Sequence, residues 1–159
     1  MEEEVYRIFE KLLIKYDVIE HKALFSASDG TNVNFNGSVC CKNLLLKDKK
    51  SDDKYLVSLE ITKKANLKAI QEQLHIGKLT FCTEEELYEE LKVRSGSVSI
   101  LNIICNPSTD VNFLIDKELL KKNKVCFHPN INTKSVCFLP ENIERILNYY
   151  NASYSFIDM

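Results

Sequence analysis

Residues 40–61, CCKNLLLKDKKSDDKYLVSLEI, decide the fold of this chain. Two apolar runs, CCKNLLL (40–46) and YLVSLEI (55–61), flank the charged stretch KDKKSDDK. Apolar runs of this length, separated by polar residues, predict the two strands of a β-hairpin. Alternate residues of the second run share one face of its strand, and these are Tyr55, Val57, Leu59 and Ile61.

On the N-terminal side of the hairpin, residues 2–16 carry apolar side chains at helical spacing. Glutamates occupy the first turn, where the helix dipole favours negative charge. We therefore expect an amphipathic helix over 2–16, a short strand over 17–21, and a loop over the turn-rich residues 26–38.

On the C-terminal side, Asn66 predicts the start of a helix that ends before a Gly77 cap. Thr83 and Glu86 have capping-box spacing and predict the start of a second helix, and Pro140 fits the first turn of a third. The expected strands are KLTFC (78–82), SVSILNII (97–104), VNFLID (111–116), KVCFH (124–128), SVCFL (135–139) and SYSFID (153–158). No repeat or low-complexity linker marks a domain boundary, so one domain is expected.

Composition excludes several classes of protein. Of 159 residues, 21 are basic and 23 acidic, and the net charge of −2 argues against a nucleic-acid coat protein or a cationic membrane binder. No apolar stretch approaches the ~20 residues of a membrane helix, and the acidic N-terminus does not resemble a signal peptide. Six cysteines lack C-x-x-C or zinc spacing. We expect a soluble cytoplasmic protein with reduced thiols.

Standard catalytic motifs are absent from the sequence. It contains no G-x-G-x-x-G or Walker-type loop, no G-x-S-x-G nucleophile elbow and no H-E-x-x-H motif. Only three histidines are present. We therefore expect neither a metal nor a cofactor, which leaves chemistry that needs few groups, or a binding role.

Three segments carry candidate functional residues. Lys42 alternates with apolar residues, so it either faces a sheltered site or extends to solvent from an edge strand. Gly96, between Ser95 and Ser97, either presents backbone N–H groups to an oxyanion or lies in an ordinary turn. The stretch FHPNINT (127–133) either lines a ligand pocket or forms a hydrogen-bonded Asx/Pro turn.

Taken together and in this order, these segments resemble the YbaK/ProX family of free-standing aminoacyl-tRNA deacylases. The likeness is greatest to the PrdX/ProXp-ala branch, which is similar to the editing domain of prolyl-tRNA synthetase. EHKALFSASDG matches the family segment H-x-x-x-F through His21 and Phe25, and CKNLLLKDKK is close to K-N-L-F-L-x-D-K-K. GSVS is similar to the start of the family loop G-x-x-x-P, and FHPNINT to F-H-P-x-x-N-T.

The resemblance implies one mixed α/β domain over residues 1–159, with a curved, barrel-like mixed sheet flanked by helices. It implies hydrolysis of the ester in mischarged tRNA, most of all Ala-tRNA(Pro), without cofactor or metal. Lys42 would position the 3′ end, the amides at Gly96 would face the ester, and His128 would line the amino-acid pocket. The remaining expected substrate-binding residues are Phe25, Ser97, Val98, Ser99, Pro129, Asn132 and Thr133. The implied partners are the acceptor 3′ end of tRNA and prolyl-tRNA synthetase, with no membrane.

One departure from the family pattern keeps alternatives open. Ile100 stands where the family loop has proline, whose ring would fix φ, so the loop could be looser here. The alternatives are a deacylase for another amino acid, serine or cysteine, and a non-catalytic module that binds aminoacyl-tRNA or a synthetase. Four lysines are expected to cluster by the site and to give weak, salt-sensitive RNA binding, namely Lys42, Lys47, Lys49 and Lys50.

Overall fold

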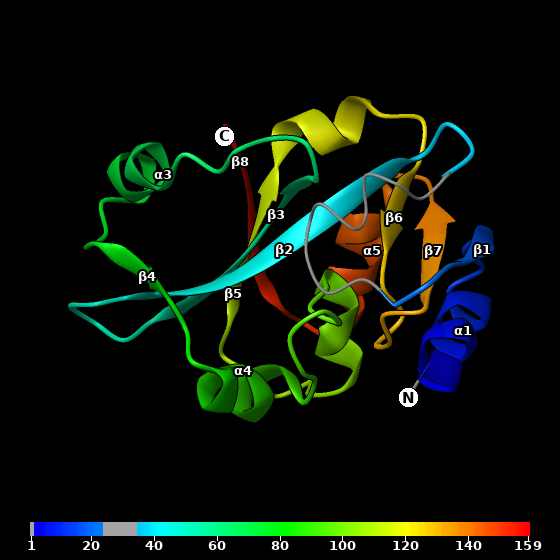
Figure 1. The fold of residues 1–159 in the computed structure, drawn as a ribbon, viewed down its shortest axis with the longest axis horizontal. Coiled ribbons are helices and arrows are strands. Elements are labelled where there is room, and N and C mark those ends of the chain that lie inside the picture. Colours follow the sequence, from blue (N-terminus) through cyan, green and yellow to red (C-terminus); the bar gives the residue numbers. More distant parts are fainter. Residues whose placement is uncertain (1, 24–34) are drawn as a thin grey trace.

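The computed structural model describes residues 2–23 and 35–159 (Figure 1). Its helices are α1 (Glu2–Lys11), α3 (Leu67–Leu74), α4 (Glu84–Leu91), α5 (Asn142–Tyr149) and the 3-10 helices η1 (Ile100–Ile104) and η2 (Lys117–Lys121). Its strands are β1 (Tyr16–Glu20), β2 (Val39–Asp48), β3 (Lys54–Glu60), β4 (Leu79–Phe81), β5 (Asn112–Asp116), β6 (Val125–Phe127), β7 (Lys134–Phe138) and β8 (Ser153–Ile157). The expected mixed α/β architecture is confirmed.

The described strands form one mixed sheet in the order β1-β7-β6-β2-β3-β5-β8, with β4 added beside β2. The hairpin predicted at the centre of the sequence is confirmed, because β2 and β3 pair antiparallel with Leu46 opposite Tyr55. The pairs β2–β6, β3–β5 and β5–β8 are parallel. Figure 1 shows β2 crossing the centre of the molecule, where it joins the two halves of the sheet.

The edge of β2 opposite β3 is shared between two short strands. β6 pairs with Val39 and Cys40 at the start of β2, and β4 pairs with residues 46–48 at its end. Between them, residues 42–44 have no strand partner on this edge within the described part of the chain. The sheet is therefore split beside the middle of β2, which is where Lys42 lies.

Helices cover both faces of the sheet. A large cluster packs α1, α4, α5 and η1 against one face, with Phe9, Phe113 and Phe138 fully buried. A second cluster packs α3 against the other face through Ile70, which contacts side chains of the β2–β3 hairpin. Apolar burial on both faces supplies the main stabilisation of the fold.

The expected strand over 97–104 is wrong, because residues 100–104 form η1. The Ser99 side chain accepts from the Leu101 N–H at 3.0 Å and so begins the helix as its N-cap. Nearly every side chain of η1 is buried. A short run that is apolar on all sides has no period that separates a strand from a buried helix.

The first helix ends earlier than expected, at Lys11. Leu13 adopts a left-handed conformation (φ 58°), and the Ile14 N–H reaches back to the Phe9 carbonyl at 2.8 Å. These features form a Schellman motif without glycine. Leu13 is consequently 86% exposed, and Ile14 is buried instead.

The cap after α3 is His75 (φ 55°) and not Gly77, which corrects the expectation. Gly77 lies against β2, where its N–H donates to Asp48 Oδ2 at 2.9 Å. A Cβ at this position would lie 2.4 Å from Asp48 Oδ1. Glycine is thus needed for a close approach of the backbone.

The expectation that all six thiols are reduced is also wrong, because Cys126 and Cys137 form a disulfide. The two residues are direct partners in the β6–β7 pair, with their Cα atoms 4.1 Å apart. Cys40 and Cys41 are buried free thiols, as expected of small core residues. Within the described residues, no helix is both long and apolar enough to cross a bilayer.

Candidate functional site

The split in the sheet beside β2 holds a cavity of about 350 Å³. Residues 40–45 of β2 form one wall. The end of β4 and helix α4 contribute to the lining through Phe81, Cys82 and Leu87, and the loop over 95–98 and His128 complete it. Segments far apart in the sequence therefore meet at the unpaired edge of β2.

Lys42 and His128 occupy matching positions on either side of this split. β2 and β6 run parallel, with Cys40 opposite Cys126 as their last pair. Lys42 and His128 each lie two residues further on, so strand alternation places them on the same face as that pair. Both residues line the cavity.

Lys42 is a partly buried cation, and burial lowers the pKa of its ammonium group. Among the described residues, no carboxylate forms an ion pair with it. The Glu84 carboxylate lines the same cavity, but among the described residues it forms no ion pair with Lys42. A partly buried ammonium group without an ion-pair partner is unfavourable, and an anionic or strongly polar ligand would offset that cost. Lys42 is therefore placed to bind such a ligand.

His128 presents a hydrogen-bond acceptor. Its Nδ1 lies 3.1 Å from the Lys134 carbonyl, so Nδ1–H is the donor and Nε2 carries the lone pair. Burial lowers the pKa of His128, and the His21 ring, 5.8 Å away, lowers it further. A lowered pKa favours the neutral ring, whose Nε2 can accept a hydrogen bond from water or an ammonium group.

Two further residues of the cavity lining carry hydrogen-bond donors. Gly96 has a backbone N–H and a φ of +91°, a conformation that glycine adopts without strain. Asn43 Oδ1 accepts a hydrogen bond from the buried Ser58 hydroxyl at 2.6 Å. This contact leaves the Asn43 Nδ2 group as the donor.

Asn102, which the sequence interpretation missed, holds two loops of the site together. Its Oδ1 accepts from the Ser99 N–H at 2.7 Å. Its Nδ2 donates to the Ser97 carbonyl at 3.1 Å and to Asn130 Oδ1 at 2.8 Å. The Asn102 side chain is fully buried, so it joins the glycine loop to the loop after β6. The Ser99–Asn102 spacing, a capping box with Asn at N3, was the available sequence signal.

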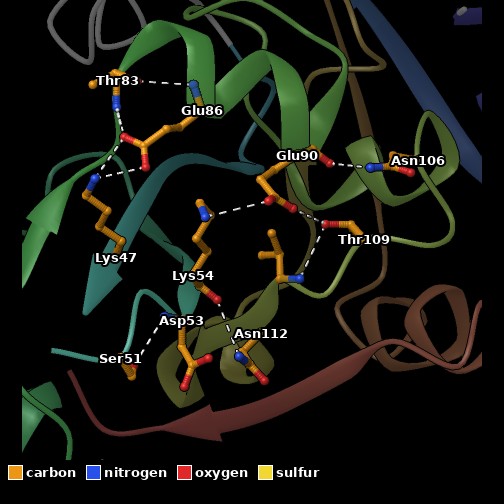
Figure 2. Close-up of polar contacts among 11 residues, drawn as sticks. Lys47, Ser51, Asp53, Lys54, Thr83, Glu86, Glu90, Asn106, Thr109 and Asn112 are labelled. Carbon is orange, nitrogen blue, oxygen red and sulfur yellow. Dashed lines mark hydrogen bonds and ion pairs between the residues drawn. The ribbon is translucent and has the colours of Figure 1, made fainter. Parts of the chain in front are cut away.

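Helix α4, part of the cavity wall, is anchored by ion pairs to β2 and β3 (Figure 2). Glu86 accepts from the Thr83 N–H at 2.9 Å and lies 2.9 Å from Lys47 Nζ. The Thr83 backbone and Lys47 lower the pKa of Glu86 to about 2. One turn later Glu90 lies 3.7 Å from Lys54 Nζ and accepts from the Thr109 hydroxyl at 3.0 Å.

The expected cluster of four lysines at the site is wrong. Lys47 is paired with Glu86 on the outer part of β2. Lys49 and Lys50 are exposed residues beyond β2, at the turn toward β3. Strand geometry places Lys49 about 23 Å from Lys42, because each residue advances ~3.3 Å. Of these four lysines, only Lys42 lines the cavity.

The other expected site residues divide between several places. Lys42, Gly96, Val98 and His128 line the cavity together. Ser97 and Asn132 line a second cavity, described below. Ser99 is a buried helix cap, and the Thr133 carbonyl accepts from the His21 N–H at 3.0 Å. Pro129 lines neither of these two cavities. Phe25 lies outside the described residues.

Within residues 2–23 and 35–159, no group of three or more His, Cys, Asp or Glu side chains is placed to hold an ion. The polar lining of the cavity includes one ammonium group (Lys42), one side-chain amide (Asn43), one imidazole (His128) and one carboxylate (Glu84).

The sequence and the fold of the chain are similar to those of known proteins. ProX, a prolyl-tRNA editing protein of Acetoanaerobium sticklandii, is 29% identical over 151 residues, which cover 94% of this chain and 92% of that protein. The prolyl-tRNA synthetase associated domain-containing protein 1 of Mus musculus is 32% identical over 136 residues, which cover 82% of this chain and 80% of that protein. The crystal structure of a proposed trans-editing enzyme for prolyl-tRNA synthetase has the same fold, with a TM-score of 0.67 at 18% identity over 99% of this chain and 96% of that one. The family model described as an aminoacyl-tRNA editing domain matches residues 22–146, so the chain belongs to the aminoacyl-tRNA editing domain family.

Proposed function

We propose that the protein is a trans-editing deacylase that hydrolyses the ester between a wrong amino acid and the 3′ adenosine of tRNA. The observation that carries the proposal is the meeting of Lys42, Gly96 and His128 in one cavity at the split in the sheet. Membership of the editing-domain family supports the reaction class. The relatives that carry prolyl-tRNA in their names support proline tRNA as the substrate. Alanine is proposed as the amino acid removed because the sequence motifs resemble those of the PrdX/ProXp-ala branch.

The proposed mechanism relies on positioning. Lys42 binds the negatively charged 3′ end and places the ester beside the glycine loop. The Gly96 N–H donates to the carbonyl oxygen, where negative charge develops as water attacks. His128 Nε2 accepts a hydrogen bond from the water or from the substrate ammonium group. An aminoacyl ester is already activated, so alignment and a few donors suffice.

Substrate size sets the proposed specificity. The cavity wall contains Leu45, Leu87 and Val98, whose apolar side chains limit the room for the amino acid. An aminoacylation site that binds proline cannot strongly reject the smaller alanine. A second site that is too small for proline removes that error without attacking the correct product.

A deacylation assay with a panel of tRNAs charged with alanine, serine, cysteine or proline tests the proposal. We expect alanyl-tRNA(Pro) to be hydrolysed fastest and prolyl-tRNA(Pro) to be spared. Lys42→Met should lower kcat/KM by about 100-fold, because it removes the group that aligns the ester. Lys68→Met, on an exposed position of α3, is the matched control. Full activity of Lys42→Met would refute the role of Lys42, and no hydrolysis of any substrate by wild type would refute the function.

The two alternatives give different results in the same panel. A preference for seryl- or cysteinyl-tRNA would indicate a related deacylase, and tight binding without turnover would indicate a non-catalytic module. The structure bears on the second alternative, because Ile100 is fully buried and the Ser99–Asn102 bonds hold the loop that lacks proline. Ile100→Pro is therefore expected to give no gain in activity.

A further inference from the structure

A second cavity, of about 240 Å³, adjoins the same loop as the first. Ser95, Gly96 and Val98 line the first cavity, whereas Arg94 and Ser97 line the second. Its other polar lining comes from the end of α4 and from the loop after β6, through Lys92, Asn130 and Asn132. One short loop therefore contributes to both cavities.

The second cavity is lined by cations and by no carboxylate. Lys92 and Arg94 are exposed, and within the described part of the chain neither forms an ion pair. The Arg94 guanidinium lies 4.8 Å from the centre of the Tyr88 ring, a cation–π contact that restrains its position. These two positive charges have no local counter-charge.

Asn130 adds an unpaired hydrogen-bond donor. The residue is only 7% exposed, and its Nδ2 is the one buried side-chain nitrogen or oxygen of the described residues that lacks a partner. Its orientation is determined by Asn102, whose Nδ2 requires an acceptor and so contacts Asn130 Oδ1. The Asn130 Nδ2 group remains as an unused donor in a residue that lines the cavity.

We propose that this second cavity binds a backbone phosphate of the tRNA acceptor strand while the ester occupies the first cavity. The inference rests on the proposed function. Phosphate oxygens accept hydrogen bonds only, and they match a lysine, an arginine and an amide donor without a competing carboxylate. Such a contact sets the position of an RNA without reading its sequence.

The test compares two substrates that differ in their phosphates. Alanyl-tRNA(Pro) has the acceptor strand, whereas 3′-alanyl-adenosine has the same ester and no phosphate. The variant is Lys92→Gln, and the matched control is Lys68→Gln on α3, which Figure 1 shows away from α4. We expect Lys92→Gln to lower the ratio of kcat/KM for tRNA over adenosine by about fivefold, as for loss of one exposed ion pair. The logarithm of the tRNA association constant falls with the logarithm of the salt concentration, and the slope of this line should become shallower by about 0.7 to 0.9 in the variant.

Asn130→Asp provides a second variant with nearly the same shape. It keeps the acceptor for Asn102 but replaces the Nδ2 donor by an oxygen that repels phosphate, so the same ratio should fall further. An unchanged ratio and salt slope in both variants would overturn the phosphate site, as would an equal loss on both substrates. If wild type hydrolysed neither substrate, the proposed function itself would fail, and that outcome is distinct from the others.

Discussion

Asn102 illustrates at the residue scale how one buried polar side chain organises a site. Its amide satisfies a backbone donor and a backbone acceptor of residues 97–99 and a side-chain acceptor on the loop after β6. A buried polar group of this kind is favourable only when all its hydrogen bonds are made. The position of the glycine loop therefore depends on this residue.

Asn102→Ala should lower the free energy of unfolding by about 2–3 kcal/mol, because it leaves buried backbone and side-chain groups without partners. The loop over 95–98 should also become less ordered, so kcat/KM for deacylation should fall more than the fraction of folded protein explains. Urea unfolding and deacylation kinetics measure the two effects. Asn66→Ala, which removes only the helix cap at α3, is the control for stability. Wild-type activity of Asn102→Ala would show that the loop is held by other contacts.

Helix α4 shows how electrostatics positions an element. The capping box at Thr83 begins the helix, and Lys47 neutralises the same carboxylate that closes the box. Because the pKa of Glu86 is lowered to about 2, the folded state prefers its ionised form. This stabilisation is fully present above the ordinary carboxyl pKa near 4.5 and is lost as the pH falls toward 2.

Glu86→Gln should lower the free energy of unfolding by about 1–2 kcal/mol at pH 7, through loss of the ion pair and weakening of the cap. The difference between the variant and wild type should shrink between pH 4.5 and pH 2, where Glu86 of wild type becomes protonated. Urea unfolding of both proteins at pH 7 and at pH 2.5 measures this difference in the free energy of unfolding. Glu85→Gln is the control, from the same turn of α4. A difference that stays constant with pH would contradict the assigned ion pair.

At the scale of the whole molecule, the disulfide acts on the unfolded chain as well as on the native sheet. Cys126 and Cys137 enclose the entire loop that carries His128 and Asn130. A cross-link of this kind removes conformations from the unfolded ensemble and so favours the folded state. The loop that contributes to both cavities is thereby closed covalently.

Reduction of the disulfide should lower the free energy of unfolding by about 3 kcal/mol, the value for a closed loop of roughly this length. Urea unfolding with and without reductant measures the change, and mass spectrometry after alkylation establishes the redox state. Cys105→Ala, which removes a free thiol, should leave the response to reductant unchanged. If fully reduced protein unfolds at the same urea concentration as the oxidised form, the cross-link does not stabilise the fold.

Much of the fold could be predicted because its signals are local. The β2–β3 hairpin follows from alternation and a charged turn, and the start of α4 follows from the Thr83–Glu86 spacing. The strand predicted over 97–104 was wrong for a physical reason. Ile100 and its neighbours in η1 are nearly all buried, so their hydrophobic pattern shows neither the period of a strand nor that of an exposed helix. The Lys47 prediction failed because its partner lies 39 positions away, on another element.

The sequence by itself determined which residue types were available for the site, namely Lys42, Gly96 and His128, because these lie in recognisable local segments. Only the tertiary structure decided that β4 and β6 leave one edge of β2 without a strand partner at residues 42–44, where the cavity lies beside Lys42. It also decided that Asn102 and Asn130 meet. Local patterns depend on neighbours a few positions apart, whereas strand pairing and buried hydrogen bonds depend on how distant segments pack.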